Sequence, residues 1–535
     1  MKRTAVVLLL MLCAFAAYGF WPLGDPTLEI RFDPDAIRAT REFLARPPVP
    51  NPKRPPNVLL ILADDLGKHE TTLYRPSSAA PTPNLERLAA DGVVFTQGYV
   101  TSPVCSPSRA GLMTGRYQQR YGFDLLTHDR YAHNRIERFV ARHFFSSHGW
   151  FVREGEPRIP VQRDIDRQGV PPTELTLAEI LKKQGYATGI FGKWHLGSGQ
   201  EMIPERRGFD TQYGFHEAFS LYADPDDPNF VGARDDYFAD RYQWRYGRSG
   251  NAAIRRNGVV IDEPRYLTDA IAAEAIAWIE AHKDRPFFAY VPFNAPHAPL
   301  QAPRAYADRF ANEPREERRV YLGMIAALDD AVGRILDALA RAGVADNTLV
   351  VFASDNGAAT YTGIADNTPL NGGKFMNYAG GVNVPFAARW PGMIPSGATY
   401  SQPISTLDAF MTIVRAAGAE LPSDRPYDGV DLLPYLRGDA TGMPHEALFW
   451  RADNSRGVLA GHYKLITDQR TGTRILFDLA ADPGEKSDLS AAEPSRVDEL
   501  EQKLRVWESQ MVAPRWPSVM EYRYRIDGHD FIFPL

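Results

Sequence analysis

Four stretches of the chain share one pattern, a continuous run of apolar residues that ends in polar or charged side chains. They are NVLLILADD (57–65), ATGIFGKWH (187–195), RPFFAYVPFNAPH (285–297) and NTLVVFASDNG (347–357). A short apolar run of this kind indicates a strand that is buried on both faces, as in a parallel sheet. We therefore predict four central strands, each with chemistry-bearing residues at its carboxyl end.

Helical segments lie between or after these runs, and the pattern predicts them at 83–91, 175–184, 269–283 and 316–342. The last has apolar residues at helical spacing, among them Val320, Met324 and Leu328. Strands that alternate with helices predict an α/β fold, in which a large, mostly parallel sheet is sandwiched between helices. Ligands of such sheets bind beyond the carboxyl ends of the strands.

From about Gly438 the strands become shorter. The stretches ALFWRA (447–452), RGVLAGHYKLITD (456–468) and RILFDLAADPGEKSDL (474–489) predict an antiparallel meander, and a helix follows at 494–511. We therefore divide the chain into an α/β catalytic domain at 20–437 and a smaller α+β C-terminal subdomain at 438–535.

The N-terminus has the features of a signal peptide. Lys2 and Arg3 precede an apolar run from Ala5 to Phe15, and small residues follow. We predict that residues 1–19 are a signal peptide and that the protein is periplasmic or secreted. An uncleaved N-terminal anchor is the alternative. No other segment reaches membrane-spanning length, so no stable membrane insertion is expected after cleavage.

Charge and cysteine content narrow the possible partners. The formal net charge of −6 gives no general attraction to nucleic acid or to anionic membranes, so an anionic substrate needs a local cluster of cations. The chain has two cysteines, and Cys13 lies in the predicted signal peptide. Cys105 then has no intramolecular disulfide partner, which leaves a free thiol, a dimer link or a chemically used group.

Oxygen-bearing side chains follow two of the predicted strands. Asp64, Asp65, Asp355 and Asn356 supply carboxylates and an amide without histidine or thiolate. Hard cations prefer such ligands, so the set favours Ca²⁺ or Mg²⁺ over zinc.

Cationic and imidazole side chains are expected beside these oxygens, namely Arg109, Lys193, Lys374, His195 and His297. Cys105 opens a predicted helix, SPSRAGLMTG, with Pro107 near its first turn. The start of a helix offers amide donors and a positive dipole end to an anion. Together these groups predict a site for a small, highly charged oxyanion and the transfer of a sulfuryl or phosphoryl group.

The stretch CSPSRAGLMTGR (105–116) resembles the C-x-P-S-R…L-x-T-G-R signature of the formylglycine-dependent (type I) sulfatases of the alkaline phosphatase superfamily. Further blocks resemble those of the family, in its order: ADDLG, GKWHLG, APHAPLQAP, SDNG and FDLAADPGEKSDL. The likeness covers most of residues 55–490. APHAPLQAP is similar to the block of arylsulfatase B-like, N-acetylgalactosamine-4-sulfatase-type members.

This resemblance implies that a formylglycine-generating maturation enzyme oxidises Cys105 to Cα-formylglycine, whose hydrate is the nucleophile. It assigns the metal, which is Ca²⁺ by family preference, to Asp64, Asp65, Asp355, Asn356 and an oxygen of modified Cys105. It implies that Arg109 and Lys193 hold the hydrated aldehyde and that Asp355 assists its attack on sulfur. Lys374 and His297 would bind the sulfate oxygens and help protonate the leaving oxygen. His195 would take the second hydroxyl proton and so release sulfate.

The substrate is the open question at this point. A sulfated carbohydrate is the first expectation, because the protein is predicted to be exported and has an aromatic, arginine-rich insert at 221–250. This insert is either a sugar-stacking wall or a packed loop, whereas a second insert at 127–172 is expected to be a solvated loop. The alternatives are a small aryl sulfate, a phosphonate monoester or phosphodiester, and a non-catalytic glycan-binding relative. The complete set of reactive residues argues against the last.

Overall fold

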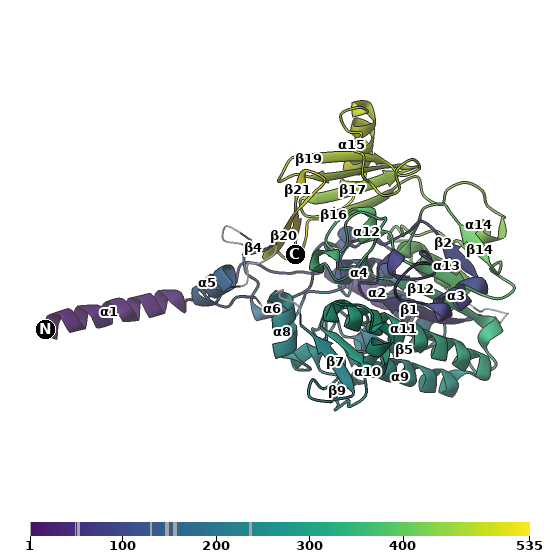
Figure 1. The fold of residues 1–535 in the computed structure, drawn as a ribbon, viewed down its shortest axis with the longest axis horizontal. Coiled ribbons are helices and arrows are strands. Elements are labelled where there is room, and N and C mark those ends of the chain that lie inside the picture. Colours follow the sequence, from purple (N-terminus) through teal and green to yellow (C-terminus); the bar gives the residue numbers. More distant parts are fainter. Residues whose placement is uncertain are drawn as a thin grey trace.

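The computed structural model describes residues 2–48, 50, 54–128, 131–144, 149–153, 158–234 and 238–535. Most of the chain forms an α/β body, and a smaller sheet with helix α15 (Pro494–Glu508) stands against one side of it (Figure 1). The predicted fold class, a helix-covered sheet plus a C-terminal part with an antiparallel sheet, is confirmed.

The main sheet has the strand order β14-β2-β13-β12-β1-β10-β5-β6-β8-β9. Its central strands run parallel, and they are β12 (Thr348–Ser354), β1 (Asn57–Ala63), β10 (Phe287–Pro292), β5 (Ala187–Lys193) and β6 (Thr211–Phe215). All four predicted strands therefore lie side by side. Their carboxyl ends share one edge of the sheet, where the polar residues that follow them meet.

The outer strands are short, and they are β14 (Ala398–Tyr400), β2 (Val93–Phe95), β13 (Phe386–Arg389), β8 (Arg255–Arg256) and β9 (Val259–Val260). β13 pairs antiparallel with β12 and β2, and β8 pairs antiparallel with β6 and β9. Strands of two to four residues carry too little periodicity to be recognised from the sequence.

Alternate residues of β1 point to opposite faces of the sheet and into two cores. Leu59 and Ile61 belong to a core with α3 (Pro83–Ala90), α9 (Leu267–His282) and α11 (Glu316–Arg341). Leu60 and Leu62 belong to the other core, with α4 (Cys105–Thr114), α7 (Leu177–Lys183) and α13 (Thr406–Ala416). The predicted helices at 83–91, 175–184, 269–283 and 316–342 are thus all present, with ends shifted by one or two residues.

The C-terminal part contains two antiparallel sheets. One is the predicted meander of β16 (Leu448–Ala452), β17 (Ser455–Ala460), β18 (Tyr463–Asp468) and β19 (Thr473–Asp478). The other joins β21 (His529–Pro534) and β20 (Met520–Ile526) to β4 (Trp150–Val152). Part of the insert at 127–172 is therefore built into a sheet and is not a solvated loop.

The remaining elements are short connections, and those used below are α5 (Arg135–Phe144), α8 (Phe238–Tyr246) and α12 (Ala379–Val382). Others are α2 (Pro34–Ala45), α6 (Gln162–Ile165), α10 (Arg304–Ala307), α14 (Leu433–Arg437), and the strand pairs β7 (Phe230–Ala233) with β11 (Leu300–Pro303) and β3 (Gly98–Tyr99) with β15 (Ile404–Ser405).

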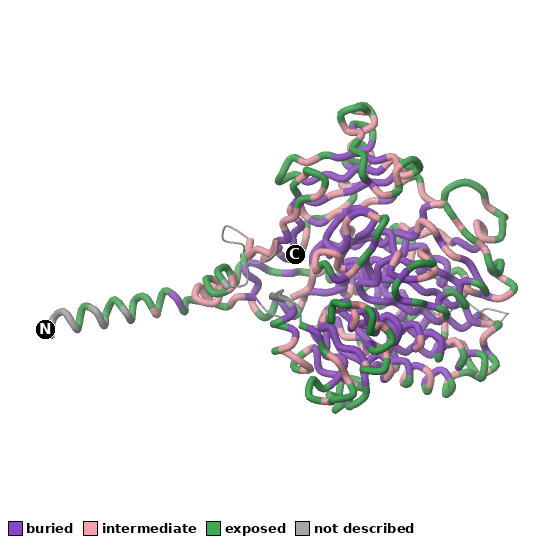
Figure 2. The backbone as a smooth tube through the Cα atoms, in the orientation of Figure 1, coloured by how far each residue is buried: buried purple, intermediate pink, exposed green. Residues whose placement is uncertain are grey.

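Helix α1 (Lys2–Gly19) coincides with the predicted signal peptide, of which Met1 lies outside the described residues. It projects away from the body, and most of its described side chains are exposed (Figures 1 and 2). Among the described residues, no helix combines the length and apolar character needed to cross a membrane. Cleavage and export stay predictions.

Candidate active site

The site is built on the register between two neighbouring parallel strands. Ala63 at the end of β1 pairs with Ser354 at the end of β12, so the acidic residues after both strands face each other. The backbone N–H of Asp65 donates to Asp355 Oδ1 at 3.2 Å, and Asn356 Nδ2 donates to Asp65 Oδ1 at 2.7 Å. The predicted oxygen cluster therefore exists.

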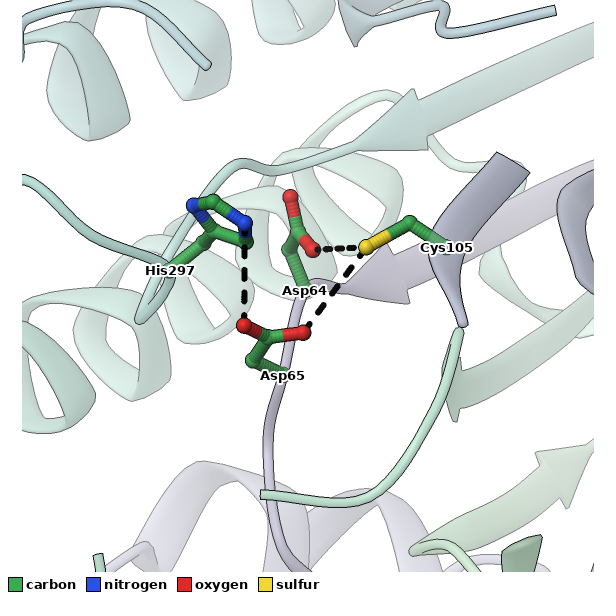
Figure 3. A group of neighbouring side chains, drawn as sticks. All are labelled: Asp64, Asp65, Cys105 and His297. Atoms are coloured by element: carbon green, nitrogen blue, oxygen red, sulfur yellow. Dashed lines mark hydrogen bonds and ion pairs between the residues drawn. The ribbon is translucent and has the colours of Figure 1, made fainter. Parts of the chain in front are cut away.

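Cys105 reaches this cluster from the first residue of α4, as predicted. Its Sγ lies 3.5 Å from Asp64 Oδ1 and 3.8 Å from Asp65 Oδ1 (Figure 3). Every residue of α4 is buried, so the helix holds this side chain in one place. Burial raises the pKa of the Cys105 thiol well above its usual value, although Lys193 opposes the shift. The unmodified side chain is therefore a protonated thiol.

Three buried cations pair with the three buried carboxylates. Arg109 Nε lies 2.8 Å from Asp355 Oδ2 and Lys193 Nζ lies 2.5 Å from Asp64 Oδ2. Lys374 Nζ lies 2.8 Å from Asp65 Oδ2. Side-chain charge thus sums to zero across these six groups, and a bound divalent cation would make the site electropositive. Such a site attracts an anionic sulfate ester in a medium of low dielectric constant.

Two histidines complete the predicted set. His297 Nδ1 lies 2.5 Å from Ala298 O and therefore carries a proton, which turns Nε2 toward Asp65 Oδ2 at 3.7 Å. His195 follows β5 in a left-handed conformation with φ 54°. Both of its ring nitrogens are buried, and neither has a hydrogen-bond partner among the described residues. His195 and Cys105 both line one cavity.

Burial and neighbouring charge shift the pKa values of these groups. Burial, together with Asp64, raises the pKa of Asp355 to about 6. Burial, together with Lys374, lowers the pKa of His297 to about 3. Burial and Lys193 lower the pKa of His195 well below its usual value. Both imidazoles are therefore neutral in this arrangement.

The residues present fit a hard divalent cation. Single ligand atoms of Asp64, Asp65, Cys105 and His297 all lie within 4.8 Å of one another. Asn356 Oδ1 is buried without a hydrogen-bond partner among the described residues, although its amide nitrogen donates to Asp65. A buried oxygen without a donor calls for a cation or a water. Asp355 lies outside the tight group, beside Asp65, and its predicted role as a ligand stays a prediction.

A cavity of about 880 Å³ opens above Cys105 and is lined by residues far apart in the sequence. Tyr242 and Tyr246 of α8 form part of its wall, so this part of the insert at 221–250 faces the site. Tyr222 is fully buried and is not on the wall. Tyr242 and Tyr246 are thus wall residues, and Tyr222 and Trp244 are not among the lining residues. Tyr237 and the side chain of Phe238 lie outside the described residues.

Tyr222 is a functional residue that sequence reasoning missed. Its hydroxyl donates to the carbonyl oxygens of Asn294 and His297, the latter at 2.8 Å. It therefore holds the segment that presents the His297 side chain. Only its aromatic character was visible in the sequence, since the partners are backbone atoms more than 70 residues away.

Comparison with known proteins agrees with this geometry, because the profile of the sulfatase family matches residues 56–419. The chain belongs to the sulfatase family. It is 33% identical to the N-acetylgalactosamine-6-sulfatase of Canis lupus familiaris over 84% of each chain. It is 32% identical to the steryl-sulfatase of Mus musculus, over 84% of this chain and 81% of that protein.

Among solved structures, the sulfatase resembles Ps i-CgsB in complex with k-i-k-neocarrahexaose. The TM-score is 0.71 at 30% identity, over 86% of this chain and 95% of that one. The relatives of this enzyme hydrolyse sulfate esters, so the predicted family and the prediction of a sulfuric ester hydrolase are confirmed. The finer likeness to N-acetylgalactosamine-4-sulfatase-type members stays a prediction.

Proposed function

We propose that this sulfatase is exported, is matured at Cys105 to Cα-formylglycine, binds Ca²⁺ and removes sulfate from a carbohydrate. Mg²⁺ is the alternative metal. The observation that carries the proposal is the position of the Cys105 side chain. It starts a buried helix and points between Asp64 and Asp65, within a ring of cations. When present, the hydrated aldehyde would supply an oxygen nucleophile, and the metal would supply electrophilic assistance.

Electrostatic stabilisation is the main work of the residues around it. Arg109 donates to Asp355 and to Lys193 O, which fixes its guanidinium beside residue 105. Lys193 Nζ pairs with Asp64 Oδ2, the same oxygen that lies 3.5 Å from Arg109 Nη2. We assign both to holding the oxygens of the modified residue, and Asp355 to receiving a proton as the attack begins. Preorganised charges of this kind need no rearrangement when negative charge develops.

Lys374 and His297 approach the cluster from the side of Asp65. We assign Lys374 to the oxygens of the bound sulfate and to protonation of the leaving oxygen. The neutral His297 ring already donates its proton from Nδ1 to Ala298 O, so it can donate to the sulfate from Nε2 only after it gains a second proton. His195 has no competing partner among the described residues, so its ring is available to take a proton in the step that releases sulfate. Each transfer thus has a donor or acceptor already in place.

The wall of the cavity supports a carbohydrate as the substrate. Trp150, Tyr242 and Tyr246 line it, and aromatic rings pack well against the apolar faces of sugars. The volume of about 880 Å³ exceeds the space that one sulfate group requires. The names of the relatives point the same way, since one is an N-acetylgalactosamine-6-sulfatase and one was solved with k-i-k-neocarrahexaose.

A sulfate ester of an apolar alcohol or phenol is the second candidate, and aliphatic side chains on the same wall favour it. Ile136 and Val140 of α5, together with Leu300 and Met520, line the cavity. Such side chains favour an apolar ring system over a hydroxylated one. One relative is a steryl-sulfatase, which fits this candidate.

Steady-state kinetics on a matched substrate panel tests these proposals. The panel contains defined sulfated mono- and oligosaccharides, a small aryl sulfate, a bulky polycyclic sulfate and a phosphodiester with the same leaving group. We expect the highest kcat/KM on a sulfated saccharide. A higher kcat/KM on the polycyclic sulfate selects the second candidate, and a phosphodiester preferred by orders of magnitude would contradict the proposed chemistry.

A further inference from the structure

Lys374 lies on the segment 371–379, which has no regular secondary structure until α12 begins at Ala379. Its middle is tied to the catalytic core, since Lys374 N donates to Ala358 O at 2.8 Å and Phe375 N donates to Pro103 O at 3.0 Å. Phe375 has φ 69°, a left-handed value that is strained for an aromatic residue. A strained segment keeps its shape only when its surroundings hold it.

Both ends of this segment are held by one residue of the C-terminal subdomain. Glu485 Oε2 accepts a hydrogen bond from Ala379 N at 2.5 Å. The backbone carbonyl of Glu485 accepts one from Asn371 Nδ2 at 3.1 Å. Asn371 Nδ2 also donates to Asp527 Oδ2 at 2.7 Å. Glu485 thus contacts both ends of the segment that carries Lys374, although it belongs to the C-terminal subdomain.

Glu485 is itself fixed by a buried ion pair. Lys464 Nζ on β18 lies 2.7 Å from Glu485 Oε1, and both side chains have 0% exposure. Lys464 Nζ also stands 5.6 Å from the ring centre of Trp450. A buried pair is weak support for stability in itself, because desolvation of both charges offsets their attraction. What the pair does provide is a fixed position for the Glu485 carboxylate.

The backbone at the two ends of this segment is packed closely, so a displacement at one end reaches the other. A Cβ on Gly380 would lie 2.4 Å from Asn371 O, and one on Gly381 would lie 2.4 Å from Gly373 O. The residues before Lys374 (371–373) therefore contact the residues after the segment (380–381) through backbone atoms. If the contact with Glu485 is lost and Ala379 shifts, the residues that carry Lys374 should shift with it, because close-packed atoms transmit displacement.

We propose that Glu485, held by Lys464, is a positioning residue for Lys374, so that the C-terminal subdomain sets the place of a catalytic cation. This inference rests on the proposed role of Lys374 in binding the sulfate oxygens. It gives the C-terminal sheet a function in the reaction beyond covering the α/β body. The ammonium group of Lys374 lies 2.8 Å from Asp65 Oδ2, and the contacts of Glu485 keep it at the proposed sulfate position.

A double-mutant cycle on the matured, metal-loaded enzyme tests the proposal. We expect Lys374→Ala to lower kcat/KM by about 10²–10³-fold, as for loss of a charge-stabilising donor. Glu485→Gln should lower kcat/KM by about tenfold through misplacement of Lys374, and should raise the inhibition constant of inorganic sulfate in parallel. In the Lys374→Ala background, Glu485→Gln should add no further loss of activity.

Glu508→Gln is the matched control, because Glu508 pairs with Arg456 at 2.6 Å in the same subdomain but does not contact the segment 371–379. It should leave kcat/KM and sulfate inhibition unchanged. If Glu485→Gln does not fold, Asn371→Ala takes its place in the double-mutant cycle. This variant removes the hydrogen bond between Asn371 and the Glu485 carbonyl without leaving a buried charge.

Two outcomes overturn the inference: kinetics of Glu485→Gln equal to those of Glu508→Gln, or a loss that persists in full without Lys374. They leave the proposed function intact. If instead Lys374→Ala retains normal turnover, the proposed role of Lys374 fails, and the inference fails with it.

Discussion

The chemistry that we propose for this sulfatase is centred on Cys105, a side chain with 2% exposure that stands between two carboxylates. Burial raises the pKa of the Cys105 thiol and keeps it protonated; Asp355 and Asp64 act in the same direction, whereas Lys193 and Lys374 oppose the shift. Reactive cysteines sit instead in electropositive, partly exposed surroundings. The position suits a precursor that is chemically converted before catalysis better than a nucleophilic thiol.

Cys105→Ala should therefore abolish sulfate release, because no other described side chain can take the place of the modified residue. Thermal unfolding of the variant should change little, since alanine is compatible with the start of a helix. Mass spectrometry of the tryptic peptide ending at Arg109 should show a species lighter than the cysteine form in the wild-type protein. Full turnover in the alanine variant would sink the assignment.

The metal ligands belong to the same scale. Asp64 and Asp65 belong to the group that could hold a cation, and Asn356 lies against Asp65 with its amide oxygen unpaired among the described residues. On the proposed metal site, chelation should abolish activity and lower the melting temperature, and added Ca²⁺ should restore both. A ligand that binds only the folded state at 100 times its Kd stabilises it by about 2.7 kcal/mol. Asn356→Ala should raise the Ca²⁺ concentration needed for half-maximal restoration. A melting temperature independent of Ca²⁺ would speak against the site.

At the scale of elements, the packing of α13 on α4 links the reactive residue to the rest of the body. Gly115 ends α4 with φ 66°, and a Cβ there would lie 2.1 Å from Cδ1 of Phe410 on α13. α13 begins with a capping box between Ser405 and Asp408. Asp408 Oδ1 also lies 2.8 Å from Nε2 of His445, just before the C-terminal meander.

This contact predicts a pH-dependent contribution to stability. Burial disfavours the charged imidazolium of His445, but the charge and hydrogen bonds of Asp408 outweigh it and raise its pKa. A raised pKa in the folded state stabilises the protein fully below the unfolded value of about 6.5, and this contribution is lost as pH rises through the folded value. His445→Gln should thus lower the free energy of unfolding by roughly 2 kcal/mol at pH 6 and by clearly less at pH 9, as measured by urea unfolding. An equal cost at both pH values would contradict the linkage.

At the scale of the whole molecule, the substrate cavity combines parts that are remote in the sequence. It is lined by residues of α5 and α8, which belong to the two inserts, and by Met520 and Leu535 of the C-terminal hairpin. Cys105 lines the same cavity. β4 joins one insert to that hairpin, since Tyr522 pairs with Trp150. Substrate selection is therefore a property of the assembled fold, whereas the reactive centre belongs to the sheet edge.

Substitution on this wall should separate binding of the leaving group from chemistry. Tyr246→Ala should raise KM for a sulfated oligosaccharide roughly fivefold, as expected for loss of one aromatic packing contact, with kcat nearly unchanged. Turnover of a small aryl sulfate should be unaffected. Tyr306→Ala, outside the cavity, is the matched control. Equal effects on both substrates would indicate a role of Tyr246 other than saccharide binding.

The sequence by itself determined the central strands, the main helices, the meander and the reactive residues. Each of these is encoded locally, either by the alternation and length of apolar runs or by residue types at the ends of strands. Asp64, Asp355 and Lys193 could be expected together for one reason only: parallel strands bring their carboxyl ends to one edge. Cys105 and Arg109 were recognisable because their motif is contiguous.

Only the tertiary structure decided the order of the strands, the pairing of β4 with the C-terminal hairpin and the shape of the cavity. It also decided the contacts of Tyr222 and Glu485, which include backbone groups of distant segments. A backbone N–H or carbonyl is the same at every residue, so nothing in the local pattern indicates which one a side chain will meet. Such pairings exist only after the chain has packed, and they decide how the reactive residues are held.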